Sequence, residues 1–116
     1  MTHGVPERGE IYLVKIPGHP NDRKRRPALV VSIDVRNRLA KDVMVVPLSV
    51  TLRLAPTHVQ IAEGEGGVRL RSMAKCEQVT TLDKSLLVRG PFAGKVADDT
   101  MVAVERGIMR AIGIVV

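Results

Sequence analysis

Apolar positions in the first two thirds of the chain follow patterns that predict short β-strands. Residues 27–34 and 43–50 are dominated by Val, Ile and Leu, which is typical of buried central strands. Pro47 interrupts the second run and marks an edge or a bulge, because proline donates no ladder hydrogen bond. Residues 57–61 alternate as a half-exposed strand does. Altogether we expect strands at residues 9–16, 27–34, 43–50, 57–61 and 72–82.

The segments between these runs have the composition of turns and surface connections. Residues 17–22 combine Pro, Gly, Asn and Asp, the residues that favour turns. Residues 36–42 are charged and polar, and we expect them to form a solvent-facing connection. Residues 63–67 predict a flexible turn, and residues 90–94 break any regular element because they contain glycine and proline.

The pattern changes to a helical period near the C-terminus. Apolar residues recur at spacings of three and four, at Met101, Val104, Ile108 and Ile112. Asp98 and Asp99 come at the expected start, where carboxylates cap a helix and suit its dipole, and Arg106 and Arg110 come near its end. Gly107 costs about 1 kcal/mol relative to Ala inside a helix, so it predicts a place of close packing.

These elements predict a mainly β fold with a C-terminal α-helix, arranged as a small β-barrel with the helix over one opening. A chain of 116 residues has the length of one domain, spanning residues 1–116, and its 45% hydrophobic content excludes disorder. We see neither a signal peptide nor a membrane-spanning run. The single cysteine, Cys76, can form no internal disulfide, which fits a reducing cytoplasm.

Positive charge is concentrated ahead of the second expected strand. The run Arg23-Lys24-Arg25-Arg26 precedes Pro27 in a chain of net charge +6. Proline restricts the residue before it to extended backbone, so Arg26 is expected at the mouth of a strand. Such a cluster suits a polyanion, and it equally suits a solvated basic turn. An aromatic content of only 2% argues against a platform on which single-stranded bases stack.

Five short motifs, in order, resemble the MazF/PemK toxins. They are Arg8-Gly9-Glu10-Ile11-Tyr12-Leu13-Val14, Arg26-Pro27-Ala28-Leu29-Val30-Val31, Pro47-Leu48-Ser49, Pro56-Thr57-His58-Val59, and the stretch from Cys76 to Lys84. The resemblance implies an SH3-like barrel of the MazF/PemK/CcdB type and a homodimer. It also implies a MazE-like cognate antitoxin as partner. The implied activity is sequence-selective, metal-independent cleavage of single-stranded RNA without a cofactor.

Metal-free RNA cleavage requires activation of a ribose 2′-hydroxyl against the neighbouring phosphate. The reaction needs a proton acceptor, a proton donor for the leaving oxygen, and cations for the charge that develops on phosphorus. The three histidines, at positions 3, 19 and 58, have neither helical pairing nor a carboxylate cluster near them, so the sequence shows no convincing metal set.

The resemblance places catalytic roles at Arg26 and Ser49. The guanidinium of Arg26 can hold two phosphate oxygens in a fork, and it stays protonated at neutral pH, so we assign it transition-state stabilisation. Ser49 stands where many relatives carry threonine, and its hydroxyl can bond a phosphate oxygen. The alternative reading makes Arg26 a surface cation and Ser49 a small residue at a strand end.

Three further residues are candidates for acid–base catalysis. Lys75 and Glu77 are two apart in an expected strand, so they would share a face and match an Arg/Asp pair of the Kid branch. They are equally readable as a plain ion pair. His19 follows Gly18, as a loop histidine does in that branch, and its ordinary pKa of about 6.5 suits proton transfer. A lone loop histidine is also often without function.

The remaining candidates are RNA contacts. The resemblance and the basic loop give Arg23, Lys24, Arg25, Gln78 and His58, the last being a rim contact or a structural residue. Cys76 alternates with its neighbours and is expected in the core. Two rival functions stay open: a CcdB-like gyrase inhibitor that does not cut RNA, and an inactive relative that only binds RNA or antitoxin.

Overall fold

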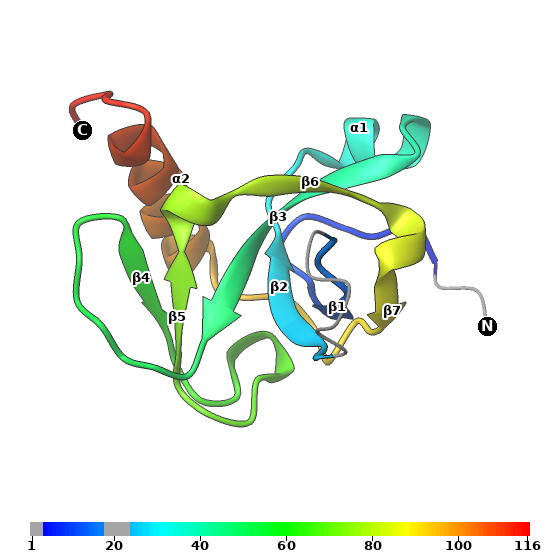
Figure 1. Ribbon diagram of the computed structural model, residues 1–116, viewed down its shortest axis with the longest axis horizontal. Coiled ribbons are helices and arrows are strands. Elements are labelled where there is room, and N and C mark those ends of the chain that lie inside the picture. Colours follow the sequence, from blue (N-terminus) through cyan, green and yellow to red (C-terminus); the bar gives the residue numbers. More distant parts are fainter. Residues whose placement is uncertain (1–3, 18–23) are drawn as a thin grey trace.

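The computed structural model describes residues 4–17 and 24–116, which form seven strands, two α-helices and three 3₁₀ helices (Figure 1). The strands are β1 (Ile11–Val14), β2 (Arg26–Val30), β3 (Asp42–Ser49), β4 (His58–Ile61), β5 (Ser72–Lys75), β6 (Thr80–Asp83) and β7 (Leu87–Arg89). The helices are α1 (Asp34–Leu39), η1 (Glu65–Gly67), η2 (Cys76–Gln78), η3 (Lys84–Leu86) and α2 (Asp98–Ala111). The expected mainly β fold with a C-terminal helix is confirmed.

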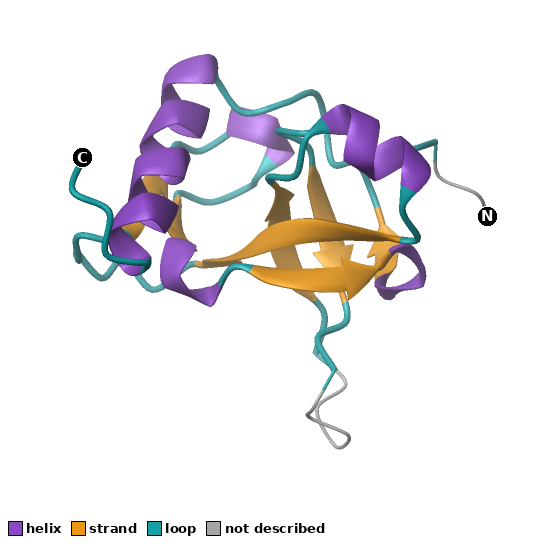
Figure 2. Cartoon of the chain, turned by 90° about the horizontal axis from the view of Figure 1, so that it is seen from above, coloured by secondary structure: helices purple, strands orange, loops and turns teal. Residues whose placement is uncertain are grey.

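The described strands form an antiparallel sheet in the order β4-β5-β3-β2-β1-β7, with β6 also paired to β3. Within the described residues β4 and β7 stand at the two ends of this path, so the expected barrel is not strictly closed. The helix α2 packs against β4 and η2, at the end of the molecule opposite β7 (Figure 1). Figure 2 shows α2 at the end that holds the C-terminus, with the strands beside it.

The buried residues form two clusters on the two faces of the strands. In β1, Ile11 belongs to the first cluster, whereas Tyr12 and Val14 belong to the second, because successive side chains of a strand point to opposite faces. The first cluster also receives Met101 and Val104 from α2. Burial of these aliphatic side chains, at about 25 cal/mol per Å², is the main force that holds the sheet in this shape.

The central strand β3 changes its partner along one edge. Its first half pairs with β6 up to Val45, and its end pairs with β5 from Leu48 onward. On the edge of β3 that faces β2, Pro47 pairs with Ala28. On the edge that faces β5 and β6, no described residue pairs with Pro47. The residue that cannot donate a ladder bond therefore stands at the interruption, as the predicted edge or bulge required.

The expected strand at residues 72–82 is wrong in its middle. It is two strands, β5 and β6, separated by the 3₁₀ turn η2. Five residues, 75–79, face only two residues of β3, so the extra chain folds into the turn. The alternating pattern hid this break because Cys76, at the start of the turn, is as fully buried as a strand residue.

Residues 36–42 form a surface connection between β2 and β3 as expected, except that residues 36–39 belong to the helix α1, which the sequence did not predict, and that Asn37 is buried. The side chain of Asn37 is fully buried, donates a hydrogen bond from Nδ2 to the carbonyl oxygen of Ser32 at 2.9 Å, and accepts one from the Ser32 hydroxyl. The same hydroxyl accepts the backbone N–H of Met44 at 3.0 Å. A polar residue therefore anchors this helix, and a search for apolar periodicity overlooks it.

The helix α2 agrees with the sequence in its core and differs at its ends. Ala97 is the N-cap and makes no side-chain cap bond, so the capping role expected of Asp98 and Asp99 is wrong; both lie in the first turn, where the helix dipole favours carboxylates. Ile112 follows the helix and is 69% exposed. Gly107 is confirmed as a site of close packing, since a Cβ there would lie 2.7 Å from Cys76 Sγ.

Candidate active site

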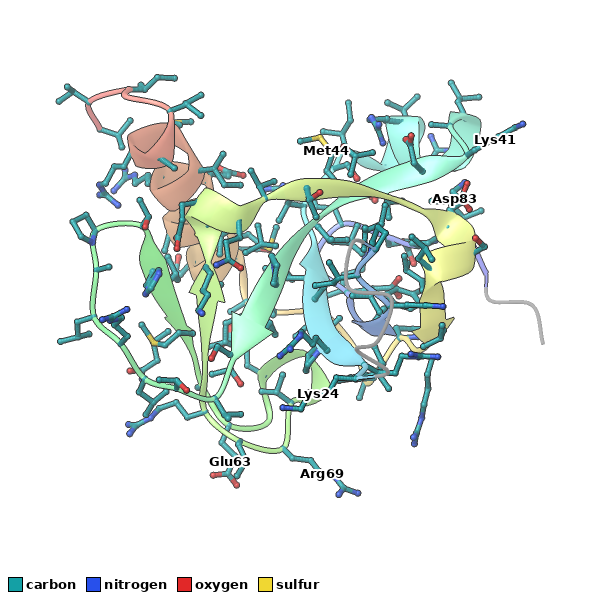
Figure 3. All side chains as sticks on the ribbon, in the orientation of Figure 1. Lys24, Lys41, Met44, Glu63, Arg69 and Asp83 are labelled. Carbon is teal, nitrogen blue, oxygen red and sulfur yellow. The ribbon has the colours of Figure 1, made fainter. Side chains whose placement is uncertain are left out.

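A groove of about 550 Å³ opens where the start of β2, the end of β3 and the end of β5 meet. The antiparallel register of β2 and β3 pairs Ala28 with Pro47, and continuing it by two residues brings Arg26 opposite Ser49. Residues that are distant in sequence thus become neighbours through strand pairing alone. Figure 3 shows Lys24 where the chain enters β2.

Six of the predicted site residues line this groove, and they are Lys24, Arg25, Arg26, Ser49, Lys75 and Gln78. Four of them are cations, and no carboxylate is among the described lining residues. The three basic residues before Pro27 are exposed, so a ligand can reach their charged ends. A surface of this kind attracts phosphate, and arginine can bind two phosphate oxygens at once.

The hydroxyl of Ser49 is held in a defined position at the edge of the groove. Its Oγ accepts the backbone N–H of Thr51 at 3.1 Å, so its own O–H keeps the donor role toward a ligand. Thr51 also lines the groove and was missed by the sequence analysis. The available signal was the Ser-Val-Thr sequence at a strand end, because a serine hydroxyl often accepts the backbone N–H two residues on and so turns the chain there.

Lys75 and Glu77 do not share a strand face, because β5 ends at Lys75 and Glu77 lies in η2. This corrects the geometry expected for the pair. Lys75 lines the groove, whereas Glu77 is not among the described lining residues. The chain turns between them, so one charge faces the groove while the other is bound by neighbouring side chains.

Those neighbours are His58 and Thr57, at the start of β4. Glu77 Oε1 accepts the Thr57 hydroxyl at 2.8 Å, and Glu77 Oε2 lies 3.0 Å from His58 Nε2. His58 Nδ1 lies 2.9 Å from the carbonyl oxygen of Arg53. We call these four residues the His58 clip. Both ring nitrogens face acceptors, so only the doubly protonated imidazolium satisfies both contacts.

The charges of the clip stabilise each other. The hydrogen bond to the Arg53 carbonyl and the bond to Glu77 raise the pKa of His58 above its ordinary value of 6.5. Desolvation works against ionisation of Glu77, but hydrogen bonds led by the one from His58 lower the pKa of that carboxyl below its ordinary value of 4.5. The His58 side chain is only 6% exposed, so it is a buried anchor, and the groove lining does not include it.

Two predicted residues, His19 and Arg23, lie outside the described residues. Among residues 4–17 and 24–116, no group of three or more His, Cys, Asp and Glu side chains is arranged to hold a metal ion. In the same part of the chain, no helix combines the length and apolar character needed to cross a membrane.

Comparison with known proteins identifies relatives along nearly the whole chain. Residues 7–112 match the family model described as PemK-like, MazF-like toxin of type II toxin–antitoxin system. Endoribonuclease MazF1 of Mycobacterium bovis is 30% identical over 110 residues, covering 95% of each chain. Endoribonuclease EndoA of Bacillus subtilis is 29% identical over 87 residues, covering 72% of this chain and 75% of its own length.

A solved structure extends this likeness to three dimensions. A mycobacterial endoribonuclease in complex with its cognate antitoxin has a TM-score of 0.79 and 28% sequence identity, covering 96% of this chain and 98% of its own. The family resemblance found in the motifs is therefore confirmed. The chain belongs to the PemK-like, MazF-like toxins of type II toxin–antitoxin systems.

Proposed function

We propose that this toxin is a sequence-selective endoribonuclease that cleaves single-stranded RNA in the groove between β2, β3 and β5, and that it does so without a metal ion. The observation that carries the proposal is the convergence of Arg26, Ser49 and Lys75 on one groove that has no carboxylate in its described lining. The endoribonuclease names of the relatives MazF1 and EndoA support it.

The reaction is a transesterification within the RNA. The 2′-oxygen forms a bond to phosphorus while the bond to the 5′-oxygen of the next nucleotide breaks. The products are a 2′,3′-cyclic phosphate and a 5′-hydroxyl. The Arg26 guanidinium holds the phosphate oxygens as negative charge grows on them, and the Ser49 O–H donates to one of these oxygens.

Proton transfer is divided among the remaining candidates. The Lys75 ammonium lies in the groove and supplies the proton to the departing 5′-oxygen. Both oxygens of Glu77 are hydrogen-bonded in the His58 clip, so Glu77 holds the turn η2 in place and does not take the 2′-proton. This leaves His19, a candidate for proton transfer that lies outside the described residues, to take the 2′-proton, with Gln78 and the basic loop binding RNA.

The active species is a homodimer whose RNA track crosses the subunit boundary. Support comes from exposed apolar side chains at the C-terminal end, which are Ile112, Ile114, Val115 and Val116. Exposed apolar groups that gather in one part of the surface favour association. Sedimentation equilibrium tests this, and a chain that stays monomeric at micromolar concentration while cutting RNA at full rate would refute it.

The partner is a MazE-like antitoxin whose acidic segment competes with RNA for the same cations. The mycobacterial relative solved with its cognate antitoxin supports such a partner. The groove cations Lys24, Arg25, Arg26 and Lys75 would attract carboxylates as they attract phosphates.

Incubation of the purified protein with mixed RNA in EDTA tests the function. We expect cleavage with EDTA present and fragments that begin with a 5′-hydroxyl. An absolute requirement for added Mg²⁺ would contradict the metal-independent route. A folded protein that cuts no RNA under either condition but inhibits gyrase would establish the CcdB-like alternative, whereas RNA or antitoxin binding without cleavage would identify an inactive relative.

A further inference from the structure

A second groove, of about 720 Å³, adjoins the first one and lies outside the predicted site. Its volume is within the range of about 300–1,000 Å³ that is usual for ligand sites. Three residues, Pro27, Val50 and Ser72, line both grooves, so the two form one continuous depression. A chain-like ligand in the first groove can therefore continue into the second.

The walls of the second groove combine apolar side chains with two arginines. The apolar part includes Leu13, Leu70 and Phe92, and the cations are Arg69 and Arg89. No carboxylate is among the described lining residues. Arg69 reaches out from the segment before β5 (Figure 3). Guanidinium groups bind phosphate, while an aromatic ring and aliphatic walls accommodate the face of a base.

The groove is also preformed. A Cβ at Gly67 would lie 2.6 Å from the backbone nitrogen of Ala93, which shows how closely η1 packs on the segment after β7. A Cβ at Gly90 would lie 2.6 Å from Tyr12 Cδ2, which fixes the opposite end of that segment against the core. These contacts hold two sides of the groove in place without a ligand, so binding costs little conformational entropy.

We infer that this second groove binds the nucleotide next to those held in the first groove, with its base against Phe92 and Leu70 and its phosphates at Arg69 and Arg89. The inference rests on the proposed ribonuclease function and adds a specificity-determining subsite to it. The combination of an aromatic and aliphatic wall with two guanidinium groups favours RNA over an acidic peptide as the occupant, because each nucleotide offers a base to the wall and a phosphate to the cations.

The experiment compares short and long RNA that cannot be cleaved. A cleavage site is first mapped with the wild-type protein, which tests the proposed function by itself. Two 2′-O-methyl oligonucleotides that contain this site are then used, of about four and about ten nucleotides, within the usual range of single-strand site sizes. Fluorescence anisotropy gives their affinities for the wild type and for the double variant Arg69→Gln, Arg89→Gln.

The wild type should bind the longer oligonucleotide more tightly, and the double variant should lose about tenfold in that affinity. Its slope of log affinity against log salt should fall by about 1.4, since each phosphate contact with a single strand contributes about 0.7. Its affinity for the short oligonucleotide should not change. The matched control is Arg38→Gln with Arg106→Gln, which removes the same charge from exposed helix positions that line neither groove.

A second variant tests the apolar wall. Leu70 is 61% exposed, so Leu70→Asn should leave the fold intact, as a thermal unfolding curve can check. This substitution should lower the affinity for the longer oligonucleotide only. Equal binding of both lengths by the wild type, or an unchanged length effect in the Arg69/Arg89 variant, would overturn the inference. The inference would also be overturned if either variant bound RNA as the wild type does but no longer bound a peptide of alternating leucine and glutamate. The second groove would then be a binding site for a protein segment.

Discussion

The first groove and the His58 clip lie side by side, and both contain charged side chains. The groove gathers charges of one sign, whereas the clip pairs opposite charges. In the groove, Lys24, Arg25 and Arg26 gather without a carboxylate among the described lining residues. In the clip, Glu77 is bound through both oxygens by His58 and Thr57. Charges that satisfy one another stabilise local structure, whereas like charges held together create a field for a ligand. The comparison explains why Lys75 and Glu77, two residues apart in sequence, have different surroundings.

The largest expected effect comes from removing one cation of the groove. Arg26→Ala should slow single-turnover RNA cleavage by about 10²–10³-fold, because it deletes a donor to the transition state. Arg26 is exposed, so the circular dichroism spectrum and melting temperature should stay close to those of the wild type. Ser49→Ala should slow cleavage less. Cleavage at the wild-type rate by folded Arg26→Ala would remove the catalytic assignment.

Neutralising Arg23, Lys24 and Arg25 together should weaken RNA binding while the fold survives. The slope of log affinity against log salt should fall by about 2, at about 0.7 for each lost contact with a single strand. Anisotropy titrations at several salt concentrations measure it. A triple variant with the wild-type slope would make this cluster a solubility feature and leave Arg26 as the functional cation.

A substitution in α2 tests the packing that supports the His58 clip, because α2 contacts the turn η2 that carries Glu77. Gly107→Ala adds a methyl group whose carbon would lie only 2.7 Å from the sulfur of Cys76, at the start of η2. The overpacking cost exceeds the gain in helix propensity, so urea unfolding should show a loss of about 1–2 kcal/mol. Val102→Ala, at an exposed position of the same helix, is the control and should stay within about 0.5 kcal/mol. A stabilised Gly107→Ala protein would mean that η2 is loosely held.

The smallest expected effect is the pH dependence of the clip. The folded-state pKa of His58 is raised, so its contribution is complete below the unfolded value of 6.5 and is lost as pH rises through the folded pKa. The pKa of Glu77 is lowered, so its contribution is complete above 4.5 and is lost as pH falls through its folded pKa. The clip is therefore strongest between these two ordinary values.

His58→Gln removes this window and provides the measurement. Relative to the variant, the wild type should be more stable by about 0.5–1 kcal/mol near pH 6, and this difference should shrink toward pH 9. Glu77 is 40% exposed, which keeps the effect small because solvent screens the pair. A stability difference that does not change between these pH values would show that His58 acts by packing alone.

The sequence predicted the parts of the molecule that depend on apolar patterning or on local motifs. Strand β3 and the core face of α2 follow from their hydrophobic residues, and Arg26 was placed at the mouth of β2 by the proline after it. The meeting of Arg26 and Ser49 came from family motifs, since only strand pairing joins them. Residue roles at both positions remain predictions.

The features that the sequence did not predict depend on contacts between distant segments or on buried polar groups. The helix α1 is anchored by Asn37, whose polarity conceals its burial. The second groove joins residues from Leu13 to Phe92, and no local pattern connects them. The engagement of Glu77 by His58 depends on the turn η2, which a strand interpretation of residues 72–82 excluded.

The missing hydrogen-bond donor of Pro47 has a consequence for how this fold can vary. Because residues 75–79 face only two residues of β3, their number is not fixed by the ladder on that edge. Lys75 pairs with His58 of β4, and the backbone N–H of Cys76 binds the Thr57 carbonyl oxygen, so we expect changes of length only after Cys76, where β3 keeps its register with β2. Gln78 lines the groove from this variable part, whereas Lys75 is fixed by its pairing in the sheet. If RNA binds in the groove as proposed, we expect its sequence preference to vary with this part of the chain while the sheet stays the same.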